Sequence, residues 1–430
     1  MSVQRGSEMA RTVIVGAGVI GLACAWELCR RGEDVLVLDR GEPGWACSAG
    51  NAGWITPSIS TPLPAPGLVG TSMRWMLKRD SPLYIKPRLD PRFAGWLTGF
   101  WRNCQPETFN RGLASLSALN QQTMPLFDRW KADGIEFEMH HAGLLFLGLS
   151  REAVEHTAVE VEQLERFGYR RPSIMSGNEV RELEPGLTDA VAGGFLVEEE
   201  RHVRPETLSA GLVARLQSEG IEIRSRVNVT GVEQRLGTVS AIQTSVGTVA
   251  ADRVLLAAGA WTGRVAQRFG FRLPIEAGKG YSVTIEHPRR VVQRPLDLIE
   301  ARVAVTPFDA GLRLAGTMEL SGLNLRVEPR RVEAIRRAGD RYLGDWRGGG
   351  AERVWVGMRP LTPDGLPVIG RAPGSDNLFV AGGHQMLGIT LAPSTGDALA
   401  RLILDGEGAE LLQPFDPARF QPARATARTR

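Results

Sequence analysis

The chain has 430 residues, a net charge of +3 and 43% hydrophobic residues. This length predicts two or three domains or one large composite domain, and the small charge argues against nucleic acid as a partner. Four cysteines without a C-x-x-C spacing argue against a disulfide framework and a metal centre, and favour a reducing, cytoplasmic compartment. The first residues carry no apolar segment typical of a leader peptide.

The stretch TVIVGAGVIGLACAWELCRRGEDVLVLD, residues 12–39, predicts a strand, a helix and a second strand. Thr12–Val15 and Val35–Asp39 are short apolar runs, and residues 19–31 carry apolar side chains at helical spacing. A G-x-G-x-x-G sequence joins the first strand to the helix. This order is typical of a dinucleotide-binding βαβ unit.

The three glycines of this turn have separate expected roles. Gly16 allows the tight turn, Gly18 lets a pyrophosphate approach the backbone, and Gly21 lets the helix pack on the strand. Asp39 ends the second strand, where a carboxylate binds ribose hydroxyls and repels a 2′-phosphate. The sequence therefore favours NAD or FAD over NADP.

Three later segments indicate that the cofactor is long. A loop of small residues at 45–57 follows the second strand, and 252–263 and 377–404 each carry a strand into a glycine turn. No second G-x-G-x-x-G follows a strand anywhere in the sequence. We therefore expect one cofactor extended across one sheet.

The motifs resemble those of the FAD-dependent amino-acid oxidoreductases, the group of D-amino-acid oxidase and glycine oxidase. Within this group the chain is most similar to the small subunit of bacterial D-amino-acid dehydrogenases, in particular over residues 65–87. The other segments that carry the resemblance are GAGVIG (16–21), GKGY (278–281), GTMEL (316–320), GMRPLTPDGLPVIG (357–370) and GGHQMLGITLAPSTG (382–396).

The resemblance implies an α/β fold, in which a discontinuous Rossmann-like FAD-binding domain is interleaved with an α+β substrate domain on an antiparallel sheet. The FAD domain is expected at 10–92, 193–270 and 350–410, and the substrate domain at 93–192 and 271–349. Expected strands of the antiparallel sheet lie at 141–149, 279–286, 302–308 and 312–319, with helices near 108–132 and 151–168. The basic, Pro/Ala-rich composition predicts a disordered tail at 411–430.

The resemblance also implies non-covalent FAD. Some relatives attach the flavin through a cysteine near Met358, but no cysteine follows Cys104 here. The residues expected to hold FAD are Gly16, Ala17, Gly18, Val19, Ile20, Gly21, Asp39, Arg40, Ser48, Asn51, Ala52, Gly53, Val227, Ala258, Gly259, Trp261, Gly383, His384, Gly388, Ile389 and Thr390.

Three residues are candidates for work on the substrate. Arg359 is expected to bind a substrate carboxylate through two parallel hydrogen bonds, because the resemblance places it at the family's carboxylate site. Tyr281 either closes over the substrate or fills a strand position, and His384 either transfers a proton or packs against the cofactor.

The expected reaction is oxidative deamination of a D-amino acid, with hydride transfer from Cα to flavin N5 and electrons passed to a quinone or other acceptor. Two alternatives stay open: an oxidase or dehydrogenase of glycine, sarcosine or a D-proline derivative, and a flavin-binding subunit of a larger redox complex. The strand at 301–308 has Ala301 and Ala304 where relatives have a tyrosine, which makes room for a larger or cyclic substrate.

Residues 73–102 combine basic side chains with Trp75, Trp96 and Trp101. This composition suits peripheral contact with the inner face of the cytoplasmic membrane. The spacing of the apolar residues from Phe93 to Trp101 equally suits a buried helix face.

Overall fold

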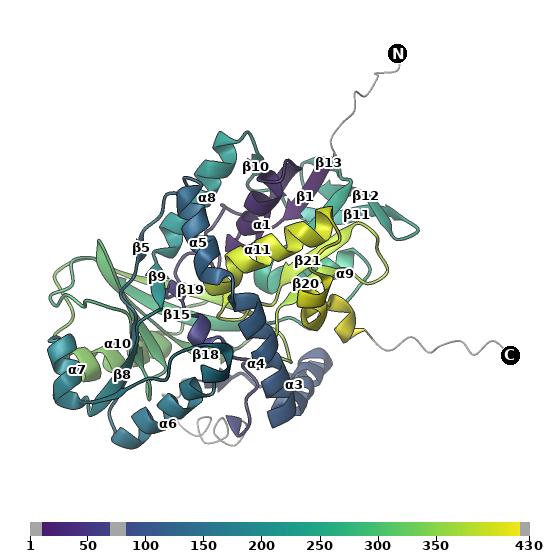
Figure 1. Cartoon of the computed structure of the whole chain (residues 1–430). Coiled ribbons are helices and arrows are strands. Elements are labelled where there is room, and N and C mark those ends of the chain that lie inside the picture. Colours follow the sequence, from purple (N-terminus) through teal and green to yellow (C-terminus); the bar gives the residue numbers. More distant parts are fainter. Residues whose placement is uncertain (1–10, 69–82, 422–430) are drawn as a thin grey trace, which may run out of the picture.

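Two large sheets form the centre of the molecule in the computed structural model, which describes residues 11–68 and 83–421 (Figure 1). The first sheet has the strand order β10-β2-β1-β14-β21-β20, and every neighbouring pair except β20 with β21 is parallel. Helices or strands cover both faces, which explains the uninterrupted apolar runs of its central strands. The strands are β1 (Arg11–Val15), β2 (Asp34–Leu38), β10 (Glu222–Arg224), β14 (Arg253–Leu256), β20 (Val368–Arg371) and β21 (Leu378–Gly382).

The two faces of this sheet have different covers. One hydrophobic core joins it to α1, α8 and α11, and a second joins it to α9 and to the small antiparallel sheet β11-β12-β13 at the top right of Figure 1. Helix α1 ends at Cys29, two residues before the predicted end, and Gly32 follows with a left-handed φ of +80°. The bounds are α1 (Val19–Cys29), α8 (Pro205–Ser218), α9 (Thr262–Arg268), α11 (Gly388–Leu404), β11 (Val229–Arg235), β12 (Thr238–Thr244) and β13 (Gly247–Ala250).

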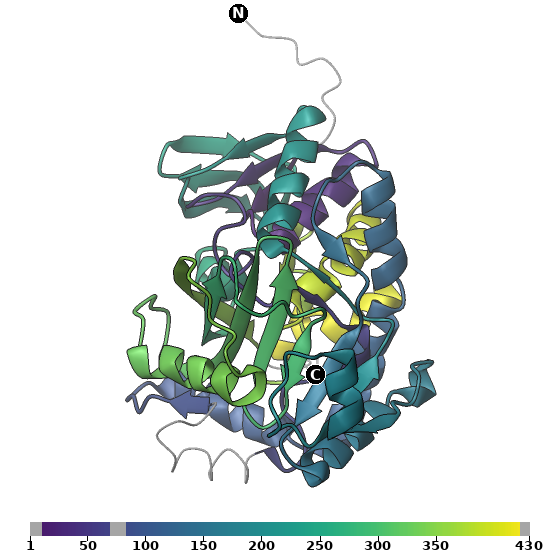
Figure 2. The ribbon, with the colours of Figure 1, turned by 90° about the vertical axis from the view of Figure 1, so that its left-hand side faces the viewer.

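The second large sheet has the strand order β19-β15-β18-β17-β16-β6-β8-β7, with β4 added beside β18. Its pairs are antiparallel except β16 with β6 and β18 with β4. Helices α7 and α10 pack on one face, where α10 is light green in Figure 2, and α6 packs on the other. The bounds are β4 (Leu83–Ile85), β6 (Leu144–Gly148), β7 (Ile174–Ser176), β8 (Gly193–Val197), β15 (Glu276–Ile285), β16 (Leu296–Leu298), β17 (Val303–Phe308), β18 (Gly311–Leu320), β19 (Glu352–Leu361), α6 (Arg151–Glu162), α7 (Gly177–Leu183) and α10 (Pro329–Leu343).

This architecture confirms the predicted fold class: a parallel, Rossmann-like sheet interleaved with a largely antiparallel one. The expected strands of the antiparallel sheet are present as β6, β15, β17 and β18. A second small sheet, the fourth sheet in all, links the loop after β2 to two later segments of the chain. Its strands, in order, are β3 (Trp54–Ile55), β9 (Arg201–Val203) and β5 (Met139–His140).

Strand pairing and helix packing cut across the predicted domain division, which stays a prediction. Strands β4, β8 and β19 lie in ranges predicted for the FAD domain, but they pair with β18, β6 and β15 of the second sheet, whose edges supply their hydrogen-bonding partners. Helices α4 (Pro106–Asn120) and α5 (Thr123–Ala132) lie in a range predicted for the substrate domain. Their apolar faces instead join the core of α1 and α11, and the indole of Trp130 donates to Glu27 of α1 at 2.9 Å.

The predicted disordered tail is wrong for residues 411–421. This segment contains part of α12 (Ala409–Leu412), then η4 (Gln413–Phe415) and η5 (Pro417–Phe420). Phe415 is fully buried, and Arg419 pairs with Asp364 at 2.7 Å. These long-range contacts outweigh the polar composition on which the prediction rested. Residues 422–430 of the predicted tail lie outside the described residues.

Candidate functional site

The turn between β1 and α1 has the geometry that close approach of a ligand requires. Gly16 has a φ of +117°, and a Cβ atom there would lie 2.4 Å from the carbonyl oxygen of Ala257. Gly18 is the N-cap of α1, so the first amides of the helix, which have no partner within the helix, follow directly. The amide of Val19 donates to the hydroxyl of Ser48 at 2.8 Å, which brings the loop after β2 against the helix. This turn combines partial positive charge with the absence of a side chain at Gly16 and Gly18.

The acidic end of β2 is held in a fixed position beside this turn. Asp39 accepts hydrogen bonds from the backbone amides of Ala17 and Gly41, both at 2.7 Å. The guanidinium of Arg40 lies 3.9 Å from the ring centroid of Trp261, at the end of η3 (Gly259–Trp261). The arrangement presents a carboxylate suited to ribose hydroxyls and, next to it, a flat cationic and aromatic surface.

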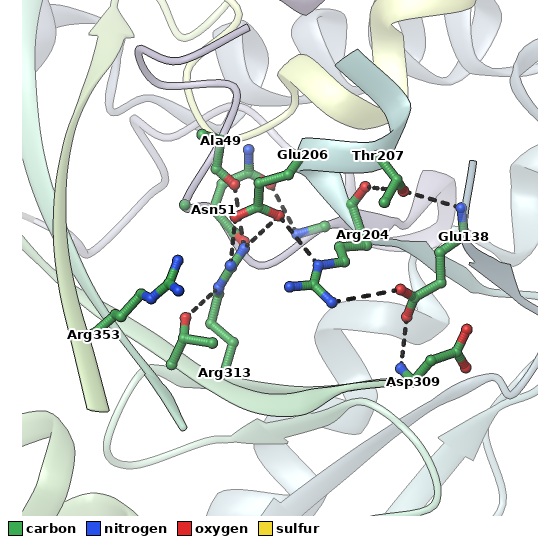
Figure 3. A network of polar contacts seen from close by, with 12 residues as sticks. Ala49, Asn51, Glu138, Arg204, Glu206, Thr207, Asp309, Arg313 and Arg353 are labelled. Atoms are coloured by element: carbon green, nitrogen blue, oxygen red, sulfur yellow. Dashed lines mark hydrogen bonds and ion pairs between the residues drawn. The ribbon is translucent and has the colours of Figure 1, made fainter. Parts of the chain in front are cut away.

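One buried arginine fastens the loop after β2 to the second sheet (Figure 3). Arg313 on β18 is 4% exposed and donates to the carbonyl oxygens of Ala49 at 3.2 Å and Asn51 at 2.9 Å. It also pairs with Glu206 of α8 at 2.6 Å. The side-chain oxygen of Asn51 accepts the amide of Gly53 at 2.8 Å, which fixes the loop internally. No sequence pattern pointed to Arg313, because its acidic partner lies 107 residues earlier in the chain.

A large cavity of about 1230 Å³ connects the glycine turn to the second sheet. This volume exceeds roughly 300–1,000 Å³, the usual range for small-molecule sites. The glycine turn, the carboxylate of Asp39 and this elongated space fit an extended dinucleotide such as FAD. Most of the predicted cofactor residues line the cavity: Gly16, Gly18, Val19, Ile20, Asp39, Arg40, Ser48, Asn51, Ala52, Gly53, Val227, Ala258, Gly259, Trp261, His384, Gly388 and Ile389.

Four residues of the predicted set stand behind the cavity wall instead: Ala17, Gly21, Gly383 and Thr390. A Cβ atom on Gly21 would lie 1.9 Å from the carbonyl oxygen of Gly16, so this glycine serves helix packing, as predicted. The hydroxyl of Thr390 accepts the amide of Thr56 and donates to the carbonyl oxygen of Trp54, both at 3.1 Å. These four residues lie outside the cavity lining, and contact with a cofactor stays a prediction for the whole set.

Arg359 lies inside the cavity, with its guanidinium reaching from β19 across β15 to β18. It donates to the carbonyl oxygen of Thr317 at 2.8 Å. Gly280 makes room for it, since a Cβ atom there would lie 2.2 Å from Nη1. Burial lowers the pKa of Arg359, but arginine starts from so high a pKa that the group stays cationic. Within residues 11–68 and 83–421 no carboxylate forms an ion pair with it, so the cation is available to an anionic ligand.

Tyr281 is placed for packing rather than for chemistry. Its side chain is 1% exposed and belongs to the core that α10 covers. Its hydroxyl donates to Glu319 at 2.7 Å, and Glu319 also pairs with Lys279 at 2.9 Å. Burial raises the pKa of Tyr281, which keeps the phenol protonated. Tyr281 belongs to the cavity lining, but these contacts favour the interpretation that it fills a strand position.

His384 lies in the glycine loop before α11 and is 2% exposed. Its Nε2 lies 3.0 Å from the hydroxyl oxygen of Thr395. Burial lowers the pKa of His384 to about 3, so the ring is neutral at physiological pH. This favours a packing and hydrogen-bonding role over proton transfer. Gly388 and Ile389 open α11 at the same wall and bring the positive end of its dipole there.

Trp355 and Gln385 are among the cavity residues that sequence reasoning missed. The indole of Trp355 fits between two glycines, because a Cβ atom would lie 2.1 Å from it at Gly50 and 1.8 Å from it at Gly357. Gln385 has a left-handed φ of +52° within the glycine loop. Gly50 and Gly357 each indicated a close approach in the sequence, but only the fold shows that both face the indole ring of Trp355.

A polar cluster apart from these lining residues bears on the expected absence of a metal. Ligand atoms of Glu138, His140 and Asp309 lie within 4.8 Å of one another. Glu138 also accepts the amide of Asp309 at 2.8 Å and lies 4.0 Å from the guanidinium of Arg204, as Figure 3 shows. A cation nearby and an occupied acceptor oxygen make this a weak metal site. The absence of a metal stays a prediction.

Comparison with known proteins points to one family. The family described as DAO, FAD dependent oxidoreductase, matches residues 11–402. A D-amino acid dehydrogenase of Cereibacter sphaeroides is 31% identical over 410 residues, and the alignment covers 93% of this chain and 93% of the relative. One of Xanthobacter autotrophicus is 32% identical over 404 residues, covering 91% of this chain and 95% of the relative. The solved glycine oxidase of Geobacillus kaustophilus has a TM-score of 0.73 at 22% identity, covering 96% of this chain and 100% of that one, which shows the shared fold.

Proposed function

The chain belongs to the DAO family of FAD dependent oxidoreductases, and from this premise we propose that it deaminates D-amino acids oxidatively to 2-oxo acids. The observation that carries the proposal is Arg359, a half-buried cation in a cavity lined mainly by apolar residues and glycines. A planar guanidinium binds a carboxylate through two parallel hydrogen bonds. The D configuration rests on the names of the relatives, which are D-amino acid dehydrogenases.

The residues of the cavity suit this reaction without a strong acid or base. Bound FAD supplies the acceptor for the hydride that leaves Cα of the neutral amine. Arg359 fixes the carboxylate and thereby restricts how Cα is presented. The neutral His384 adds no charge to the site, while the start of α11 favours added negative charge at its wall. The imino acid product then takes up water and releases ammonia, which leaves the 2-oxo acid.

We propose that the FAD is held without a covalent bond. Among the described cysteines, Cys47 lines the cavity, and burial raises the pKa of its thiol to about 11. A thiol that stays protonated is a poor nucleophile toward the flavin. FAD released intact by denaturation supports this part of the proposal, and flavin that stays with the precipitated protein contradicts it.

We further propose that a quinone or another electron-transfer acceptor, rather than oxygen, takes the electrons. The relatives' name of dehydrogenase supports this. We keep the cytoplasmic location with peripheral contact at the membrane as part of the proposal. Helix α3 (Pro91–Asn103) exposes Trp101 to 58%, but Phe93 and Trp96 are buried, as the packing interpretation predicted, and Trp75 lies outside the described residues. Within residues 11–68 and 83–421 no helix is long and apolar enough to cross a membrane.

Anaerobic reduction of the purified yellow protein tests the proposal. A panel of D- and L-amino acids, glycine, sarcosine and proline derivatives is added, and bleaching of the flavin is followed. We expect D-amino acids to bleach it and a quinone analogue to reoxidise it faster than oxygen. Rapid peroxide formation without dye or quinone reduction would favour an oxidase. A protein that retains FAD but is bleached by no member of the panel would favour a flavin-binding subunit of a larger complex.

A further inference from the structure

The cavity extends past Arg359 to a second polar group on the same sheet, Asp297. Strand β16 buries Leu296 and Leu298 in the core on the α10 side, so Asp297 between them points to the opposite face. Asp297 is among the residues that line the cavity. The carboxylate of Asp297 has no role in the reaction proposed above.

The floor of the cavity between the two groups consists of small side chains. Asp297 is in register with Ala304 on β17, and Ala304 is in register with Ala315 on β18. Both alanines line the cavity. Small residues along this row leave open space beside the carboxylate, where relatives were expected to carry a tyrosine. The space admits a long substrate side chain that runs from Arg359 toward Asp297.

The spacing of the sheet sets the length of that side chain. The guanidinium of Arg359 binds Thr317 on β18, while Asp297 lies two strands further along the sheet. Two strand spacings are about 10 Å, and the offset of two residues along β18, from Ala315 to Thr317, adds about 7 Å at a right angle. The two backbone positions are therefore about 12 Å apart. An amino acid with a long side chain, together with one ion-pair contact at each end, spans this separation.

Arg302 places a cation near Asp297, but the two side chains form no ion pair. No hydrogen bond or ion pair of its carboxylate is found in residues 11–68 and 83–421. Burial raises the pKa of Asp297 to about 6, with smaller effects of Arg302, which lowers it, and Glu160, which raises it. Glu160 and His156 of α6 line the outer part of the cavity, with side chains 52% and 76% exposed. At neutral pH a mostly ionised carboxylate inside a cavity favours a cationic ligand group.

We propose that Asp297 selects substrates whose side chain ends in a cation, so that the preferred substrates are basic D-amino acids. This inference rests on the proposed function, because it takes Arg359 as the site of the α-carboxylate. Arg359 then binds the α-carboxylate of the substrate, and Asp297 binds the cation at the end of its side chain. Neutral side chains of equal length leave Asp297 with water only.

Binding of two unreactive carboxylates to the FAD-loaded protein tests the inference. The probes are 6-aminohexanoate, which ends in an ammonium, and hexanoate, which ends in a methyl group, and the readout is calorimetry. We expect 6-aminohexanoate to bind the native protein about tenfold or more tightly than hexanoate. Asp297→Asn should abolish this difference through weaker binding of 6-aminohexanoate, with hexanoate unchanged. The control Asp189→Asn, at a fully exposed carboxylate, should keep it.

The outcomes separate this inference from the proposed function. Equal binding of both probes to the native protein, or a difference that survives Asp297→Asn, would overturn the role of Asp297. Arg359→Ala should weaken both probes alike, since both carry the carboxylate. In the turnover assay, D-lysine should exceed D-norleucine in kcat/KM with the native protein but not with Asp297→Asn. If no D-amino acid bleaches the flavin at all, the proposed function fails, whatever the two probes show about Asp297.

Discussion

Replacement of Arg359 by alanine is the most direct test of how the cavity holds its substrate. The half-buried guanidinium donates to the carbonyl oxygen of Thr317 and has no acidic partner in the described part of the chain. A substrate carboxylate in that position would lose its only charged contact. Truncating one member of such a pair costs about 2–5 kcal/mol. This corresponds to a decrease in kcat/KM of about 30-fold to several thousandfold.

The structure also predicts what the substitution leaves intact. Burial lowers the pKa of Arg359, which means that the folded protein holds this charge at a cost. Arg359→Ala should therefore fold with an unchanged or higher melting temperature and remain yellow, because the residue is assigned to substrate rather than to FAD. Arg359→Lys should recover part of the loss, since a point charge cannot form two parallel hydrogen bonds. Arg151→Ala, at a side chain 84% exposed, serves as the surface control.

The assay is anaerobic stopped-flow reduction of the flavin with D-amino acids and with amines that lack the carboxylate. Amino acids should lose most of their rate with Arg359→Ala, and the simple amines, slow from the start, should lose little. Equal losses for both substrate classes, or loss of FAD from the variant, would refute the assignment and give Arg359 a structural role.

Three further predictions concern Gly280, Arg313 and His384. Gly280→Ala should push the guanidinium aside and lower kcat/KM about 100-fold with FAD retained, whereas Gly349→Ala, with open space around it, should have no effect in the same assay. Arg313→Met should free the loop after β2 and weaken FAD binding about tenfold in a fluorescence titration, and Arg353→Met, at a side chain 76% exposed, should not; equal affinities would contradict the role of the buried arginine. The pKa of His384 is about 3 in the folded protein and about 6.5 in the unfolded chain, so the unfolded chain binds the extra proton between these values and stability falls as the pH drops through that window. Urea titrations at pH 7.5 and pH 5 give the decrease in unfolding free energy between the two pH values. This decrease should be about 2 kcal/mol smaller for His384→Gln than for the native protein, and an equal decrease would refute a neutral buried ring.

The glycine turn and its acid could be predicted because their signals are local. Gly16, Gly18 and Asp39 lie within one βαβ unit, where spacing alone brings them together. Arg359 was predicted only through a resemblance, since an arginine in a strand carries no local sign of burial. The structure supplies that sign, in the space that Gly280 leaves for its guanidinium.

Contacts between distant segments could not be read from the sequence. Arg313 meets the carbonyl oxygens of the loop after β2 across 262 and 264 residues, which no periodicity encodes. The place of β19 in the second sheet has the same origin. The residues of β19 do not reveal that β15, more than 60 residues earlier, is its partner. Phe415 likewise fixes residues 411–421 through a core that the local composition does not reveal.

Strand β19 carries Arg359 in the second sheet, and the chain then runs through six residues into β20 of the first sheet. The strand that carries the proposed carboxylate-binding residue and an edge strand of the first sheet are thus consecutive pieces of one backbone. The protein is not modular: no single crossover point would separate substrate recognition from the redox half. Chimaeras of two such enzymes joined there would splice strands of unlike sheets. New specificities in this architecture should therefore arise by substitutions in place, at floor positions such as Ala304 and Ala315, rather than by recombination of whole domains.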